Sequence, residues 1–218
     1  LSINYLYLIE DDLINLPSKL AINFHGSLLP KYRGRTPHVW SIINNEYECG
    51  ITAHKITIGC DAGDIITQVV VPIKQNDTGA DLLNKYSVLY PKLVNQLLKD
   101  IEEEKNIFIK QNEQKATYFG RRTSEDGLID WNWHKERIRN WIRAQAYPYP
   151  GAFTFIEGNK IVIDKVDYDD YGFNENHPNG LLLSENPPRV KTSNGVLKLT
   201  IIRNGIDYLK QNKIFNNK

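Results

Sequence analysis

The residues best suited to chemistry lie in one stretch, Ala21–Gly34, with the sequence AINFHGSLLPKYRG. If the apolar residues around Phe24 form a strand, its period of two places Asn23, His25 and Ser27 on one side. An amide beside an imidazole suits a reaction in which a carbonyl carbon becomes tetrahedral, because Asn donates to the developing oxyanion while His moves a proton. The alternative is that both side chains only satisfy loop backbone, and the spacing alone favours neither interpretation.

A second polar stretch, Gly59–Asp64, is a loop punctuated by glycine. Such a loop brings the carboxylate of Asp61 against a histidine, orients the ring and favours its protonated form. The loop's backbone amides and carbonyls also remain available to a planar heterocycle. Taken alone, a turn of this kind is more often a solvated connection. Cys60 has no dedicated base in the sequence, so we interpret it as loop packing and not as a nucleophile.

Strands and helices must position these residues, and the first half of the chain predicts an α/β arrangement. Apolar and β-branched runs predict strands at 2–9, 20–25, 51–58 and 65–73. A short helix is expected after Glu10, and a second begins at Pro37, capped by the hydroxyl of Thr36. A long helix begins at Asp77 or Thr78 and runs to about residue 104. Its predicted apolar side contains Leu82, Leu83, Tyr86, Leu89, Val94 and Leu97.

The second half of the chain predicts a smaller, mainly antiparallel β domain. We assign residues 1–110 to the first domain, 111–127 to a polar connection and 128–218 to the second domain. A helix is expected at 138–146, and strands are expected at 152–156, 160–166, 189–192 and 196–202. Three tryptophans are expected to serve packing and not ligand binding: Trp131, Trp133 and Trp141.

Composition restricts the class of protein. The 218 residues are 41% hydrophobic and 24% charged, which indicates a folded chain. Lys and Arg number 27 against 26 Asp and Glu, a balance that disfavours a nucleic-acid partner. No apolar run reaches the roughly 18 residues of a membrane span, so we expect a cytoplasmic protein without a membrane partner. Cys49 and Cys60 form neither a disulfide framework nor a zinc-ligand spacing, and we expect no metal.

Several separated motifs carry a resemblance to a known family. Asn-x-His-x-Ser-Leu-Leu-Pro-x-x-x-Gly from Asn23, followed by Asp-x-Gly at Asp61, resembles the catalytic core of the folate-dependent formyltransferases. Three longer motifs are HGSLLPKYRGRTP at His25–Pro37, FGRRT at Phe119–Thr123 and RAQAYPYPGAF at Arg143–Phe153. These motifs are most similar to those of the nucleotide-sugar N-formyltransferases, which act on UDP-4-amino-4-deoxy-arabinose or dTDP-4-amino-4,6-dideoxyhexoses.

This resemblance runs from residue 1 to at least residue 155 and implies a fold. The expected architecture is a formyltransferase-type doubly wound sheet followed by a small β-rich C-terminal domain. Family members carry about half of a doubly wound domain ahead of the strand that begins here at Ser2. Because the chain begins at Leu1, we expect the N-terminal part of that domain to be missing and the chain to be a fragment with an exposed sheet edge.

The resemblance also implies site residues. The family's catalytic trio matches Asn23, His25 and Asp61. Its pterin-binding backbone matches Tyr7, Leu8 and Ile9 together with Thr57, Ile58, Gly59 and Cys60. The implied reaction is attack of a neutral sugar amine on the formyl group of 10-formyltetrahydrofolate, with the oxyanion bound by Asn23 and His25. Proton removal falls to His25 or to water, and tetrahydrofolate leaves.

The nucleotide end of the substrate is less well defined. Arg121 and Arg122, near Tyr118, are typical of a diphosphate site with a stacking face, but a salt-bridged linker explains them equally well. Tyr149 and Tyr147 form either an aromatic wall for the sugar nucleotide or interdomain packing, and we favour the wall.

Other basic residues and histidines complete the candidates. The next candidates for an anion site are Lys31, Arg33 and Arg35, with bracing of the catalytic loop as their alternative role. Four histidines have no partner pattern and receive no role: His38, His54, His134 and His177.

Together these features predict an enzyme that transfers the formyl group of 10-formyltetrahydrofolate to a nucleotide-linked amino sugar. A dTDP-4-amino-4,6-dideoxyglucose type of acceptor is favoured, in lipopolysaccharide or O-antigen biosynthesis. One alternative is a methionyl-tRNA formyltransferase, which the acidic residues of the second half disfavour. A second alternative is a folate-binding remnant without turnover. The β-rich end also allows a homodimer. The acidic residues are Asp164, Asp167, Asp169, Asp170, Glu175 and Glu185.

Overall fold

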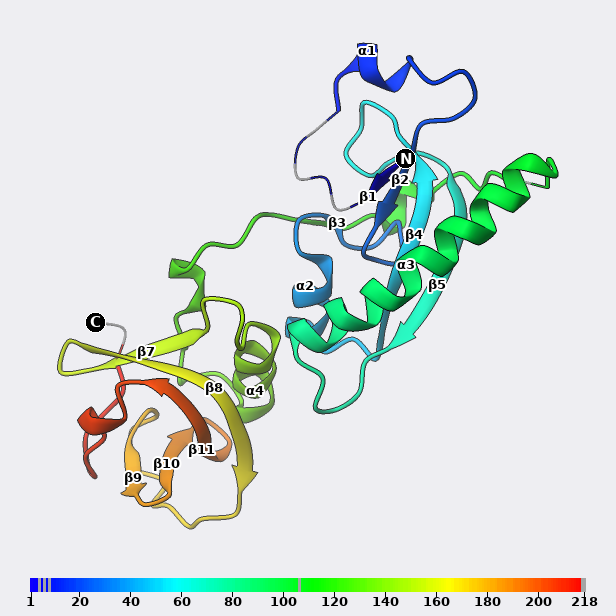
Figure 1. The fold of residues 1–218 in the computed structure, drawn as a ribbon. Coiled ribbons are helices and arrows are strands. Elements are labelled where there is room, and N and C mark those ends of the chain that lie inside the picture. The colour runs from blue at the N-terminus through cyan, green and yellow to red at the C-terminus, as the bar shows by residue number, and fades with distance from the viewer. Residues whose placement is uncertain (4, 6, 8, 106, 217–218) are drawn as a thin grey trace. The chain divides into compact units, whose positions relative to one another are not determined.

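The structure is a computed structural model that describes residues 1–3, 5, 7, 9–105 and 107–216. It divides into two compact units, whose elements are labelled in Figure 1. The first unit comprises Leu1–Ser41, Glu46–Gln75 and Asp81–Arg122. The second comprises Ile42–Asn45, Asn76–Ala80 and Thr123–Lys218. Residues 111–122, which we expected to belong to a connection, therefore pack with the first unit.

A four-stranded sheet forms the first unit, in the order β1–β2–β4–β5. The strands are β1 (Ser2–Ile3), β2 (Ile22–His25), β4 (Glu48–Lys55) and β5 (Ile65–Pro72). β1 runs parallel to β2, whereas β2 with β4 and β4 with β5 are antiparallel. The connection between β4 and β5 is too short for a parallel crossover, which needs about a dozen residues. The expected α/β class is confirmed, and the described part of its sheet is mixed.

Three helices accompany this sheet: α1 (Asp11–Ile14), α2 (Pro37–Ile43) and α3 (Gly79–Glu102). α3 runs along one face of the sheet, and the hydroxyl of Tyr86 reaches the carbonyl of Gly26 at 3.1 Å (Figure 1). Its buried stripe repeats every three or four residues, as a helix requires. The expectation for Leu83 was wrong, because it lies beside this stripe and is 41% exposed. The stripe contains Leu82, Tyr86, Tyr90, Leu93 and Leu97.

α2 begins at Pro37, as predicted, but Thr36 does not cap it in the expected way. The φ of Thr36 is 49°, in the left-handed region, and its hydroxyl is buried without a hydrogen-bond partner among the described residues. Only its carbonyl serves the helix, by accepting from the amides of Val39 and Trp40. The left-handed backbone turns the hydroxyl away from the amides that a usual N-cap accepts from.

A second, small sheet joins the loop after β2 to residues near 118. β3 (Arg33–Gly34) pairs in parallel with β6 (Tyr118–Phe119), and the short 3₁₀ helix η1 (Glu113–Lys115) precedes β6. The sequence did not predict these two-residue strands, since hydrophobic periodicity needs longer runs. Their pairing is the reason that residues 111–119 pack with the first unit.

The beginning of the chain differs from its prediction. A buried strand was expected at 2–9, of which residues 4, 6 and 8 lie outside the described residues. Among the described residues of this range, Ser2–Ile3 form a strand, and Tyr5 and Tyr7 are 60% and 73% exposed. Within the described residues, β1 has a strand neighbour on one side only. β4 also ends earlier than expected, at Lys55, because the backbone pairs Lys55 with Asp64 and leaves the residues between them as a loop.

The second unit consists of α4 (Lys135–Ala144) and a five-stranded antiparallel sheet in the order β7–β8–β11–β10–β9. The strands are β7 (Ala152–Ile156), β8 (Asn159–Asp169), β9 (Leu182–Glu185), β10 (Pro188–Thr192) and β11 (Gly195–Asn204). Two 3₁₀ helices flank them, η2 (Glu125–Gly127) and η3 (Ile206–Tyr208). The predicted β-rich unit is confirmed, although the sequence did not predict β9.

The tryptophans of this unit pack, as predicted. Trp131 is buried in the core and stacks on Phe215 with ring centroids 5.1 Å apart. Trp133 and Trp141 lie against the same core with an edge-to-face contact of 5.1 Å. Among the described residues, no helix has both the length and the apolar character that crossing a membrane requires.

Candidate active site

The register of the central strands brings two histidines and an asparagine together. In the β2–β4 pair, Asn23 lies opposite His54 and His25 lies opposite Thr52. The predicted neighbours Asn23 and His25 therefore acquire a third polar partner, His54. Sequence reasoning gave His54 no role because only the cross-strand register, and no spacing along the chain, places it here.

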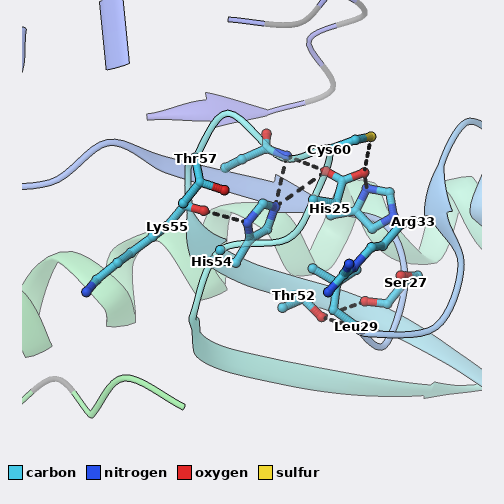
Figure 2. Close-up of polar contacts among 12 residues, drawn as sticks. His25, Ser27, Leu29, Arg33, Thr52, His54, Lys55, Thr57 and Cys60 are labelled. Carbon is cyan, nitrogen blue, oxygen red and sulfur yellow. Dashed lines mark hydrogen bonds and ion pairs between the residues drawn. The ribbon is translucent and has the colours of Figure 1, made fainter. Parts of the chain in front are cut away.

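The imidazoles of His25 and His54 both face the carboxylate of Asp61 (Figure 2). One carboxylate oxygen, Oδ2, lies 3.5 Å from Nδ1 of His25 and accepts from the amide of Gly34 at 2.9 Å. The other, Oδ1, lies 3.5 Å from Nε2 of His54 and accepts from Nδ2 of Asn23 at 3.4 Å. The structure thus brings the predicted trio together, with His54 as a fourth member.

The ring of His25 is 7% exposed and its tautomer follows from its partner. Nε2 lies 2.7 Å from the carbonyl of Tyr32, so this nitrogen must carry a hydrogen to donate. In the neutral ring the lone pair is then on Nδ1, beside Asp61. Burial lowers the pKa of His25, against the opposing effects of the Asp61 charge and the Tyr32 carbonyl. The expectation that Asp61 favours the protonated ring holds for its own contribution, but burial outweighs it.

Burial by itself raises the pKa of Asp61, yet its partners more than reverse the effect. When the two rings are protonated, the hydrogen bond from Nε2 of His54 and the charge of His25, together with the amide of Gly34, bring the pKa well below its usual range. Asp61 is therefore ionised at neutral pH. A proton that arrives at Nδ1 of His25 meets a carboxylate at once.

The amide of Asn23 is oriented by two neighbours. Nδ1 of His54 donates to the carbonyl of Lys55 at 2.8 Å, so Nε2 of the neutral ring is an acceptor. Nδ2 of Asn23 lies 3.3 Å from that nitrogen and 3.4 Å from Asp61. These two acceptors fix the end of the amide that carries hydrogens on the side of Asp61 and His54.

Ser27 does not join the cluster, contrary to the period-of-two expectation. Its hydroxyl donates to the carbonyl of Lys31 at 2.7 Å, and its own carbonyl accepts from the Thr52 hydroxyl at 2.6 Å (Figure 2). β2 ends at His25, so the alternation of a strand no longer applies two residues later. Ser27 serves the shape of the loop.

A cavity of about 700 Å³ lies against the cluster. Its walls include the trio Asn23, His25 and Asp61 and every described residue of the predicted pterin site; Leu8 lies outside the described residues. The side chain of Ile58 is 78% exposed at this wall. An apolar surface with peptide edges suits a flat heterocycle with polar rims. The described pterin-site residues are Tyr7, Ile9, Thr57, Ile58, Gly59 and Cys60.

The four predicted nucleotide-binding residues are not among those that line this cavity. Tyr118 accepts from Nη1 of Arg33 at 2.5 Å, and Arg122 lies over the ring of Trp40 at 5.0 Å. Tyr149 belongs to the second unit, where burial raises the pKa of its hydroxyl. The predicted role of Tyr118, Arg121, Arg122 and Tyr149 stays a prediction.

The structure distinguishes the roles of two other candidates for an anion site, Arg33 and Arg35. Arg33 is fully buried and bonded to protein partners, so the bracing interpretation holds for it. Arg35 lines the cavity and remains a candidate for an anion site. Cys60 also lines it and is exposed, and desolvation together with the Asp61 charge raises the pKa of its thiol to about 11, which disfavours a nucleophilic thiolate. Its expected role in loop packing stays a prediction.

Comparison with known proteins assigns the family. Residues 2–98 match the family described as formyl transferase, and residues 121–218 match the formyl transferase C-terminal domain. A 4-N formyltransferase from Francisella tularensis is 30% identical with a TM-score of 0.65, and the match covers 74% of this chain and 67% of that one. The chain belongs to the formyltransferase family, and its resemblance to the nucleotide-sugar branch is supported.

Two further solved structures are similar to this chain. An N-formyltransferase from Helicobacter canadensis, in complex with folinic acid and dTDP-3-aminofucose, is 28% identical with a TM-score of 0.65 over 83% of this chain. The chain spans 66% of the length of that enzyme. A methionyl-tRNA formyltransferase from Clostridium thermocellum shares the fold at 21% identity, with a TM-score of 0.61 over 77% of this chain and 71% of that chain.

Proposed function

We propose that this chain transfers a formyl group from 10-formyltetrahydrofolate to the amine of a nucleotide-linked amino sugar. The observation that carries the proposal is the cavity against which Asn23, His25 and Asp61 meet the predicted pterin loop. The solved relatives that bind folinic acid with dTDP-3-aminofucose, or act as a 4-N formyltransferase, support the chemical class of both substrates. A dTDP-4-amino-4,6-dideoxyglucose type of acceptor, in cell-surface polysaccharide synthesis in the cytoplasm, is the finer part of the proposal.

The residues of the cavity fit the donor. The loop 57–60 offers exposed apolar surface and backbone groups, and the trio lies at the edge of the same space. When bound, 10-formyltetrahydrofolate supplies the formyl group. Arg35, at the cavity wall, is placed to meet an anionic group of either substrate.

The trio then has complementary tasks. Nδ2 of Asn23 exchanges its long contact with Asp61, 3.4 Å, for a hydrogen bond to the formyl oxygen as negative charge develops there. Nδ1 of His25 accepts the proton that the attacking amine loses, and the ionised Asp61 stabilises the resulting imidazolium. His54 keeps the amide of Asn23 turned toward the reaction. Positioning two substrates against these groups supplies most of the rate gain.

The test is a formyl-transfer assay on the chain with 10-formyltetrahydrofolate and a panel of UDP- and dTDP-linked amino sugars. Tetrahydrofolate release is followed by absorbance, and the formylated sugar is identified by mass spectrometry. We expect turnover with at least one 4-amino sugar. A chain that binds a folate analogue in calorimetry but formylates no member of the panel supports the folate-binding alternative.

The assembly is a separate part of the proposal. A homodimer formed through the β-rich second unit is consistent with the closed two-fold symmetry that most small oligomers adopt. Sedimentation of the chain over a range of concentrations tests it, and a single monomeric species at all concentrations rejects it.

A further inference from the structure

The turn that carries Asp61 adopts a conformation that its own residue type does not favour. The φ of Asp61 is 49°, in the left-handed region. Residues other than glycine adopt this region at an energetic cost, and they keep it only when surrounding contacts determine it. Its carboxylate accepts from Gly34, but this bond fixes the side chain and leaves the backbone of the turn unexplained.

The backbone of this turn is bound by Gln111, a side chain from 50 residues further along the chain. Nε2 of Gln111 donates to the carbonyl of Asp61 at 2.8 Å and to the carbonyl of Gly63 at 2.7 Å. Both hydrogens of the amide are therefore used on the turn. The residue is 5% exposed, so water does not compete for these bonds.

The other end of the same amide is fixed by Arg33. Oε1 of Gln111 accepts from Nη2 of Arg33 at 2.7 Å and from Nε at 3.2 Å. Rotation of the amide by half a turn would set its NH₂ against the guanidinium and its oxygen against two carbonyls. The orientation of Gln111 is therefore determined by chemistry and has no alternative.

Arg33 is itself immobilised. Its side chain is 0% exposed, and Glu113 accepts from its two terminal nitrogens at 2.7 and 2.8 Å. The hydroxyl of Tyr118 accepts from it as well, at 2.5 Å. A buried guanidinium with this many acceptors is a rigid support. A continuous series of bonds thus runs from Glu113 through Arg33 and Gln111 to the turn of Asp61.

We propose that Gln111 is a positioning residue for the reaction, which acts by fixing the backbone of the Asp61 turn so that the carboxylate meets His25 and His54. This proposal rests on the proposed function, since it names the residue that prepares the same site. The competing role is purely structural, in which Gln111 serves only as an acceptor for the buried Arg33.

The variant Gln111→Glu separates the two roles. It retains an oxygen toward Arg33 but replaces the NH₂ group with an oxygen that two carbonyls repel. A matched control makes the same amide-to-carboxylate change one residue away, Asn112→Asp, where the exposed side chain only accepts from the amide of Gln114. We expect kcat to fall by about tenfold or more in Gln111→Glu, with the KM values little changed, because small displacements of reacting groups cost this much. The control should keep the parent kcat.

Two readouts identify the route of the effect. In NMR titrations of the histidine rings, the pKa of His25 should fall in Gln111→Glu, because Asp61 moves away. The new carboxylate alone would raise that pKa, so the sign of the change distinguishes displacement from added charge. In a double-mutant cycle, Gln111→Glu should cost little more once Asp61→Asn is present, because both changes remove the same interaction.

Each outcome decides the proposal. An unchanged or raised pKa of His25, or kinetic effects that add fully to those of Asp61→Asn, overturns it. If Gln111→Glu does not fold, the parent protein still tests it, since the side-chain NH₂ protons of Gln111 must exchange slowly with solvent, and fast exchange overturns it. A parent chain without formyl transfer rejects the proposed function but leaves the His25 titration decisive for Gln111.

Discussion

Two polar regions of the first unit differ in how their side chains are constrained. Around Asp61, each functional atom has at least one partner that fixes its direction, and the atoms converge on one cavity. In the segment of Tyr118, Arg121 and Arg122, Tyr118 accepts from the buried Arg33 and Arg122 lies over the ring of Trp40. None of these three is among the described residues that line the cavity. The first region therefore directs its side chains at a ligand cavity, whereas the known contacts of the second are made with the protein itself.

The largest effect should come from the first region. His25→Ala and Asn23→Ala should each lower kcat by about a hundredfold or more, because they remove the proton acceptor and a donor to the developing oxyanion. The melting temperature and the affinity for the nucleotide sugar should change little. Ser87→Ala on the exposed side of α3 is the control. A normal kcat in His25→Ala would contradict the role of His25 as proton acceptor. It would also contradict the difference in function between the two regions.

Asp61→Asn should lower kcat less, on the order of tenfold, since the carboxylate acts through His25. Because the Asp61 charge raises the pKa of His25, its removal should lower that pKa, and the acidic limb of the pH–activity profile, where His25 becomes protonated, should move to lower pH. An NMR titration that finds the same His25 pKa in both proteins contradicts the pairing.

The same variant tests a stability effect with a defined sign. The pKa of Asp61 is lowered in the folded protein, so its contribution to the free energy of unfolding is present above its ordinary pKa near 3.8 and is lost as pH falls below that value. Urea unfolding of the parent protein between pH 5 and about pH 3 should therefore show a steeper loss than unfolding of Asp61→Asn. Equal slopes would contradict the pKa direction.

The second region should give a smaller effect. If Arg121 or Arg122 binds a diphosphate, its replacement by Ala should weaken nucleoside-diphosphate binding by about 1.5 kcal/mol or somewhat more, without changing the affinity for a folate analogue. Calorimetric titration of each variant with both ligands measures this. Unchanged nucleotide affinity in both variants moves the anion site to Arg35, which lines the cavity, and not to the buried Arg33.

The smallest effect is expected at Cys60. Its thiol lies at the cavity wall, but a pKa of about 11 leaves very little thiolate at neutral pH. Cys60→Ser should change kcat by less than about twofold, and iodoacetamide should modify the parent protein more slowly than it modifies free cysteine. Rapid alkylation with loss of activity would contradict the packing role.

The parts predicted from sequence share a local cause. The periodicity of a single segment predicts β7 and much of the buried stripe of α3. Sequence motifs within 39 residues, Asn23 to Asp61, predict the trio. His54 and Gln111 were missed because their roles depend on a strand register and on a contact across 50 residues. β3 and β6 were missed because two residues carry no measurable period.

The pairing of β3 with β6 has a consequence for recombination. An exchange of the second unit between relatives, whether in evolution or in the laboratory, needs a crossover point that leaves the candidate site of the first unit intact. A crossover near residue 110 would give Arg33 and Asp61 a foreign Gln111, Glu113 and Tyr118. A crossover after Phe119 keeps these partners together, so chimeras joined there should inherit the donor chemistry of one parent whole.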